Sequence, residues 1–278
     1  MGHPTRYREL DTTDLAARFA EATPWPHVVL DDLVTGDPEA IAAAFPSASW
    51  PGWTTRFRDR YQAEKRTCDD IDAIPEPLQA IIADLQGPGF LEAVEAITGI
   101  EAMIPDPYLS GGGLHLSGPG GLLEPHTDFH VYPRLNLFRQ VNVLLYLNPT
   151  WDEAWGGCLE LFADDRATVS AKQVTPAFGR CVLFRTDDRS VHGFPTRVAD
   201  GRWRKSIALY YYTAVDRPGY VGDKYTYWRR HGEHHGLNKA RLQVHKALVA
   251  GQGFLAKAAK ASRPTEPKPI ETPPTRHR

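Results

Sequence analysis

GGGLHLSGPGGLLEPHTDFH, residues 111–130, is the stretch that decides the fold of this chain. Glycines cluster within it around a short apolar run of the kind found in β-strands. It ends in His126-Thr127-Asp128, and residues i and i+2 of an extended strand point to the same side. One short segment therefore presents an imidazole and a carboxylate together. This pair also occurs by chance in many proteins, so alone it is a weak sign of a metal site.

Three residues further along the chain strengthen the interpretation. His192 lies 64 residues after Asp128, beside a glycine, and Arg204 and Ser206 open a later apolar run. Two imidazoles and one carboxylate on one face of iron(II) leave positions open for oxygen and a cosubstrate, as in non-haem iron oxygenases. The guanidinium of Arg204 suits the distal carboxylate of 2-oxoglutarate, and Ser206 shares its strand face.

The sequence changes in character at Gly99. Before it, apolar spacing and capping residues predict helices over 13–22 (capped by Thr13), 37–45 (capped by Asp37), 75–86 and 88–98, with a buried strand over 25–31. After it come short strand-like runs separated by turn-forming residues, at 113–118, 140–148, 158–163, 180–186 and 205–213. Strands without long helices between them favour a β-sandwich or barrel. Residues 50–72, charged and aromatic, have no clear assignment.

Composition limits the class of protein. The 278 residues are 42% hydrophobic and 24% charged, with a formal net charge of -2, so no strongly basic field points to nucleic acid. Three widely spaced cysteines form no CxxC pair and fit a reducing compartment. The polar start is unlike a signal peptide, and no apolar run is long enough to span a bilayer. We expect a cytoplasmic protein without a membrane partner.

From about 100 to 215 the motifs together resemble the prolyl-4-hydroxylase-like branch of the Fe(II)/2-oxoglutarate-dependent oxygenases. The motifs occur in the usual order of that family: the HxD pair, QVNVLLYLN, GGCLELF, RCVLFRTDDRSVHGFP and RKSIALYYYT. The resemblance implies an α+β fold with a double-stranded β-helix (jelly-roll) core. We therefore expect a supporting helical and strand region at 1–99, the oxygenase core at 100–215, a helical extension at 216–260 and a disordered tail at 261–278.

The resemblance also implies an activity. Such enzymes use Fe(II), 2-oxoglutarate and O2, with ascorbate as a supporting reductant, and release succinate and CO2 as they hydroxylate an unactivated C–H. His126, Asp128 and His192 take the metal role, and Arg204 takes the 2-oxoglutarate role with help from Ser206 and Tyr146. Asn142 shares a strand face with Tyr146 and fits either a cosubstrate contact or a structural hydrogen bond. Many prolyl hydroxylases use a lysine at this point. Lys205 is adjacent, but only one of the two neighbours can point inward, and Ser206 shares a face with Arg204.

The substrate remains open at this stage, as does the oligomeric state. Candidate contacts are His115, His130, Arg139 and Trp151, although each of the first two also fits a structural histidine and Trp151 also fits packing. We expect a small metabolite or a prolyl or amino-acid-like substrate. The alternatives are a non-catalytic metal-binding or sensor protein and an oxidative dealkylase; the neutral charge balance argues against nucleic acid as its target.

Overall fold

The structure, a computed structural model, describes residues 6–132, 134–218, 222, 224–229, 244 and 248. That part of the chain contains four α-helices: α1 (Thr12–Glu21), α2 (Pro38–Ala44), α3 (Glu76–Leu85) and α4 (Pro88–Thr98). None of the helices in the described ranges has the length and apolar character needed to cross a bilayer. Most of the predicted extension at 216–260 and all of the predicted tail at 261–278 lie outside the described residues.

Capping residues explain where the helices begin and end. The carboxylate of Asp37 accepts from the Glu39 backbone N–H and starts α2, as predicted. The predicted cap of α1 was wrong: Asp11, not Thr13, accepts the free backbone N–H groups of the first turn. Gly99 ends α4 in the left-handed conformation at a φ of 67°.

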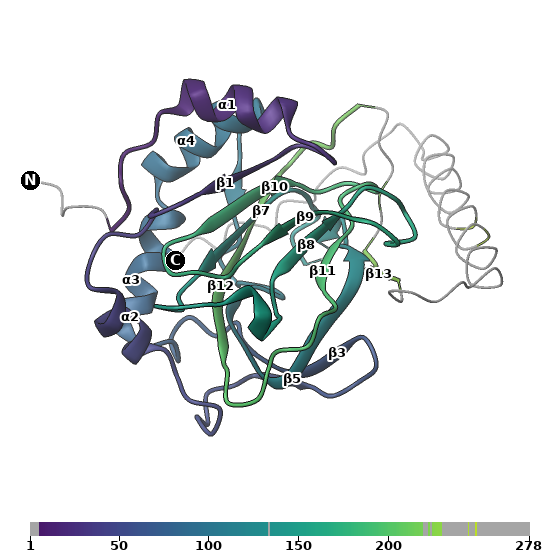
Figure 1. Ribbon diagram of the computed structural model, residues 1–278. Helices are drawn as coiled ribbons and strands as arrows, with labels where there is room; N and C mark the ends of the chain where they lie inside the picture. Colours follow the sequence, from purple (N-terminus) through teal and green to yellow (C-terminus); the bar gives the residue numbers. More distant parts are fainter. Residues whose placement is uncertain are drawn as a thin grey trace, which may run out of the picture. The chain divides into compact units, whose positions relative to one another are not determined.

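One antiparallel sheet contains all the named strands of the described chain. Its main path runs β1-β10-β7-β12-β5-β11-β8-β9 and curls into a barrel (Figure 1). The strands are β1 (His27–Leu30), β2 (Thr55–Phe57), β3 (Gln62–Cys68), β4 (Ile104–Pro105), β5 (Gly113–Thr127), β6 (Val131–Tyr132), β7 (Leu137–Tyr146), β8 (Leu159–Phe162), β9 (Ser170–Val174), β10 (Cys181–Arg185), β11 (His192–Phe194), β12 (Arg204–Thr213) and β13 (Tyr227–Trp228). A short 3-10 helix, η1 (Glu153–Trp155), precedes β8. The α+β class predicted from the sequence is confirmed.

Alternation along β7 separates the core from the barrel interior. Val141, Val143 and Leu145 belong to the hydrophobic cluster that also contains the buried residues of α1, α3 and α4. Asn142 and Leu144 point the other way and line a cavity. A strand with one face under helices and one face in a cavity cannot slip by one residue without exposing its apolar side chains. The helices thus hold the register of the strands that carry the polar residues.

Residues 50–72, unassigned from the sequence, form the hairpin of β2 and β3. β3 pairs with β5 from Gln62 opposite Leu123 to Cys68 opposite Leu114. β5 itself is much longer than the predicted strand at 113–118: it continues to Thr127 and pairs with β3, β11, β12 and β13. The hairpin thereby adds a wall beside β5. Residues 1–233 cluster as one compact unit, and the predicted boundaries within it stay a prediction.

Candidate active site

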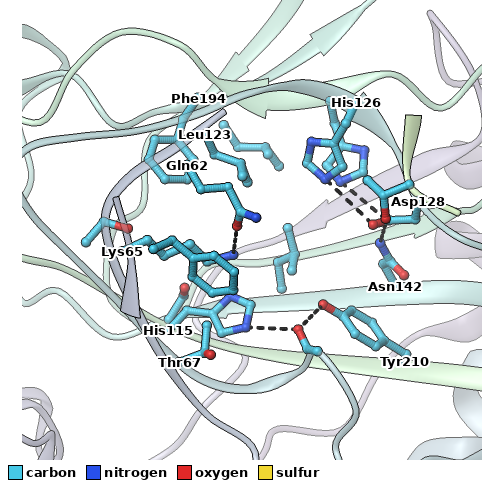
Figure 2. Close-up of a pocket in the computed structure, with 18 of the residues that line it drawn as sticks. Gln62, Lys65, Thr67, His115, Leu123, His126, Asp128, Asn142, Phe194 and Tyr210 are labelled. Carbon is cyan, nitrogen blue, oxygen red and sulfur yellow. Dashed lines mark hydrogen bonds and ion pairs between the residues drawn. The ribbon is translucent and has the colours of Figure 1, made fainter. Parts of the chain in front are cut away.

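A polar cavity of about 310 Å³ opens inside the barrel. Side chains from β3, β5, β7, β11, β12 and β13 line it, so residues from both halves of the sequence meet there. Figure 2 shows His126, Asp128 and Asn142 on one side of this cavity, with Gln62 and Lys65 on the other.

Three predicted ligands come together at one end of the cavity. His126 lies near the end of β5, Asp128 follows it, and His192 begins β11, where it pairs directly with His126. One ligand atom from each of the three lies within 4.8 Å of the others. His126 Nε2 is 3.6 Å from Asp128 Oδ1, and His192 Nε2 is 3.5 Å from Asp128 Oδ2. A single metal ion can be reached by all three.

Backbone carbonyls orient both imidazoles. His126 Nδ1 lies 2.9 Å from the Glu124 carbonyl oxygen, and His192 Nδ1 lies 2.8 Å from that of Ser190. A carbonyl only accepts, so Nδ1 donates and Nε2 keeps its lone pair toward Asp128. Burial, with His126 nearby, lowers the pKa of His192 to about 4, which keeps its imidazole neutral. This tautomer and charge state are the ones that bind a metal.

Asp128 is held as a carboxylate by two neighbours from β7. Arg139 Nη2 approaches Asp128 Oδ2 at 3.1 Å in an ion pair, and Asn142 Nδ2 donates to the same oxygen at 2.7 Å. Arg139 Nε in turn donates to Asn142 Oδ1 at 2.7 Å. Burial alone raises the pKa of Asp128, but the charge of Arg139, together with the two adjacent imidazoles, outweighs it and holds the pKa well below the ordinary value. Asp128 is therefore an anion over the whole useful pH range.

Arg204 occupies a second polar region, on β12. Its Nε donates to the Gly157 carbonyl oxygen at 2.7 Å, and its Nη2 donates to the Tyr146 hydroxyl at 3.2 Å. Nη1 lies 3.4 Å from Ser206 Oγ. The guanidinium also lies over the ring of Phe194 at 4.3 Å. These contacts fix the orientation of the Arg204 guanidinium beside the hydroxyl groups of Ser206 and Tyr146. This arrangement of donors suits a carboxylate ligand.

Strand register places the polar side chains of the cavity in two rows. Ser117 on β5 is opposite Lys65 on one side and Arg204 on the other. In the next row, His115 is opposite Thr67 and Ser206, and all six residues line the cavity. Ser206 is also opposite Tyr146 on β7. The cavity floor is thus a polar array built across four neighbouring strands.

Comparisons with known proteins agree with this geometry. Residues 112–212 match the family model of the 2OG-Fe(II) oxygenase superfamily. The match identifies the barrel core as a domain of this superfamily. The protein is a 2-oxoglutarate-dependent dioxygenase, and its cofactors are Fe(II), 2-oxoglutarate and O2. No curated protein sequence matches the chain significantly.

Solved structures with the same fold include a prolyl hydroxylase from Trichoplax adhaerens in complex with a hypoxia inducible factor peptide. That protein is 16% identical, with a TM-score of 0.52, and the match covers 72% of this chain and 88% of the other. The epimerase SnoN, in complex with Fe3+, alpha ketoglutarate and nogalamycin RO, is 14% identical with a TM-score of 0.50; the match covers 80% and 96%. At such identity the likeness shows the fold alone, which is the double-stranded β-helix.

The residues that line the cavity of the oxygenase fit both Fe(II) and 2-oxoglutarate. The His126, Asp128 and His192 set offers two neutral imidazoles and one anionic carboxylate, which is the donor set preferred by non-haem Fe(II). Arg204, with its surrounding hydroxyl groups, fits a carboxylate. Lys205 points away: its Nζ donates to the Ala42 carbonyl oxygen at 2.8 Å.

The sequence analysis named no role for several residues that line the cavity of the oxygenase, among them Gln62, Lys65, Thr67 and Trp228. The strand QAEKRTC has almost no apolar residues, so it lacks the alternation of apolar and polar residues by which strands are recognised. A strand that lines a polar cavity can form without apolar residues on that face. Trp228 lies on the short strand β13 and stacks on His126, with ring centroids 4.6 Å apart. No local pattern marks such a residue.

Of the four residues predicted to contact the substrate of the oxygenase, two line the cavity and two lie outside it. His115 and Arg139 line the cavity, although Arg139 is occupied with Asp128. His130 is outside its lining and bonds Asp216 Oδ1 through Nε2 at 2.8 Å. The Trp151 indole donates to the Gly156 carbonyl oxygen at 2.9 Å, also outside the cavity. The geometry gives no support to a substrate role for the last two.

Proposed function

We propose that this oxygenase hydroxylates an unactivated C–H of a small metabolite or an amino-acid-like substrate, with release of succinate and CO2. The observation that carries the proposal is the presence, in one cavity, of the His126, Asp128 and His192 set and of Arg204. When bound, iron and 2-oxoglutarate supply the oxidising power, since decarboxylation of the keto acid accompanies reduction of O2 and transfer of one oxygen atom.

The protein residues supply position and charge. His126, Asp128 and His192 would hold the metal on one face, and Arg204 with Ser206 and Tyr146 would hold the distal carboxylate of 2-oxoglutarate. Asn142, predicted as a cosubstrate contact, instead donates to Asp128 and fixes the orientation of that carboxylate. Asp128 would give the metal a full carboxylate ligand, which favours hydroxylation over halogenation, because related halogenases have a small residue there.

The first experiment is anaerobic addition of Fe(II) and then 2-oxoglutarate to the metal-free protein, followed by visible absorption. A weak charge-transfer band is expected, and it should be absent in His126→Ala. The absence of a band from a folded protein would favour the alternative of a metal-binding protein that does not use the cosubstrate.

The second experiment separates the possible reactions. Succinate release is measured together with the mass of the product formed from each candidate substrate. A product heavier by one oxygen atom supports hydroxylation. An unchanged mass with inverted stereochemistry would instead favour epimerisation, the activity named for SnoN. Loss of a small aldehyde would favour dealkylation.

A further inference from the structure

Lys65 is a buried cation with no counter-ion of its own among the described residues. It is 9% exposed, and its one hydrogen bond is from Nζ to Gln62 Oε1, a neutral amide, at 3.2 Å. Burial and then the charge of Arg204 lower its pKa to about 8. Its Nζ also lies 5.4 Å from the centre of the Phe57 ring. A buried ammonium without an anionic partner destabilises a fold by several kcal/mol in general, so this position is suited to an anionic ligand.

The register of β3 shows which way the ammonium extends. The Cα of Lys65 lies opposite Ser117, but Gln62, whose amide it reaches, lies opposite Leu123 farther along β5. That direction leads along β5 toward His126 and Asp128, and both Asp128 and Arg204 remain close enough to shift the pKa of Lys65. Figure 2 shows Gln62 and Lys65, joined by this hydrogen bond, on the side of the cavity across from His126 and Asp128. The ammonium therefore lies between the row of Arg204 and the candidate metal ligands, where it is open to a substrate that approaches the metal.

The charges that line the cavity indicate what kind of ligand group the Lys65 ammonium would bind. The described lining contains three cations, Lys65, Arg139 and Arg204, and two carboxylates, Asp69 and Asp128, for a net charge of one positive unit. Divalent iron and the dicarboxylate 2-oxoglutarate cancel each other in charge, so the loaded cavity keeps this excess. Arg139 is paired with Asp128, and Arg204 would be paired with 2-oxoglutarate. Asp69 accepts a hydrogen bond from Thr54 at 2.8 Å and makes no ion pair with Lys65, so Lys65 is the lining cation without an ion pair among the described residues.

We propose that Lys65 binds the carboxylate of an acidic substrate, with the Gln62 amide beside it. This inference rests on the proposed function and specifies its substrate class. One carboxylate neutralises the excess charge, whereas a phosphate dianion would reverse it. The cavity of about 310 Å³ also has to hold 2-oxoglutarate, so the acid is small or enters by one end.

The test uses the full-length protein loaded with Zn(II), a diamagnetic substitute for iron, and 2-oxoglutarate. Ligand-observed NMR then measures binding of short aliphatic, cyclic and aromatic carboxylic acids, each compared with its uncharged primary amide. The matched variants are Lys65→Met, Arg204→Met and, as a control on the exposed strand β9, Lys172→Met.

We expect acids to bind and their amides not to bind. Lys65→Met should weaken acid binding roughly ten- to a hundredfold, the effect of losing one charge-assisted bond, with a far smaller effect on 2-oxoglutarate. Arg204→Met should show the opposite pattern, and Lys172→Met should match the parent protein.

Three outcomes would overturn the assignment: amides that bind as well as acids, no acid that binds the loaded protein, or a Lys65→Met variant that loses 2-oxoglutarate as Arg204→Met does. The same spectra report 2-oxoglutarate itself. If it binds while the acids do not, the substrate inference fails and the proposed function stands. If 2-oxoglutarate does not bind, both fall.

Discussion

Arg204 and Lys205 are neighbours in the sequence and face opposite sides of β12. Arg204 lines the cavity, whereas Lys205 donates to Ala42 under the N-terminal helices. Alternation along a strand decides this outcome, since two successive side chains cannot share a face. The pair consequently provides a matched test of the cosubstrate site.

Arg204→Met is expected to raise the dissociation constant of 2-oxoglutarate roughly ten- to a hundredfold, because a charged, forked hydrogen bond is lost. Lys205→Met should leave it unchanged. Titration of the anaerobic charge-transfer band measures both values. Equal loss in the two variants would contradict the assignment of Arg204.

Lys65 should favour binding of an acidic ligand but destabilise the ligand-free protein. Its pKa of about 8 in the folded protein lies below the ordinary 10.5, mainly because of burial. Below pH 8 the ammonium is charged in both states, and its burial then destabilises the ligand-free fold fully. Between pH 8 and pH 10.5 the unfolded chain binds a proton that the folded protein has released, so stability rises with pH.

We therefore expect Lys65→Met to stabilise the ligand-free protein, by about 3 kcal/mol at neutral pH. The difference between the variant and the parent should shrink as the pH rises through this window. Urea unfolding at a series of pH values checks it. A variant less stable than the parent at pH 7 would show that Lys65 has a structural role instead.

At the scale of elements, β13 reaches the candidate metal site through a single aromatic side chain. Trp228 pairs opposite His126 in the sheet, stacks on its imidazole, and is itself stacked on Tyr61 at 5.4 Å. The ring therefore covers one face of a candidate ligand and limits how far the imidazole can turn. Residues that orient a ligand commonly change metal affinity when they are removed.

Trp228→Ala should weaken Co(II) binding about tenfold, the lower end of the usual effect of such residues. Trp155→Ala is the control, since Trp155 packs with Trp151 and Arg202 outside the cavity. Equilibrium titration of the Co(II) absorption bands measures both. Unchanged affinity in Trp228→Ala would mean that β13 merely covers the barrel.

The seam between β3 and β5 depends on one glycine. Gly113 has a φ of 76°, and a Cβ there would lie 2.1 Å from the Cys68 carbonyl oxygen. Gly120 has a φ of 75° with open space around it. The two positions thus share the backbone conformation and differ in the close approach of a neighbouring strand.

Gly120→Ala should lower the free energy of unfolding by about 1 kcal/mol, the cost of the left-handed conformation. Gly113→Ala should lower it by several times as much, because backbone atoms must also move apart. Urea unfolding compares them. Equal effects would indicate that β3 adjusts freely against β5.

At the scale of the whole molecule, the free energy of unfolding should depend on the bound metal and on bound 2-oxoglutarate. The triad joins β5 to β11, and Arg204 joins β12 to β7 and to the Gly157 loop, so bound ligands tie distant strands together. A ligand that binds only the folded state adds about 2.7 kcal/mol at a hundredfold excess over its dissociation constant.

We expect Zn(II) alone to raise the Tm by several degrees, and 2-oxoglutarate to raise it further only when the metal is present. His126→Ala should lose both increments. Differential scanning calorimetry measures them. A full effect of 2-oxoglutarate without metal would place its binding elsewhere.

The amino-acid sequence by itself determined the chemistry of the candidate site. Few residue types bind Fe(II) or a carboxylate well, so His126, Asp128, His192 and Arg204 stood out once the intervening strands were recognised. Strand alternation further predicted that Asn142 and Tyr146 would share a face, because that property depends only on neighbours along one strand. Helix ends followed from local capping, apart from the first cap.

Tertiary structure alone decided which distant strands meet. Lys65 entered the cavity because β3 pairs with β5 in one particular register, and Trp228 because β13 returns beside His126. The fold also brings His130 against Asp216, 86 residues away, outside the cavity lining. Contacts between strands depend on loop paths and on packing of the whole barrel, and no local sequence pattern carries that information.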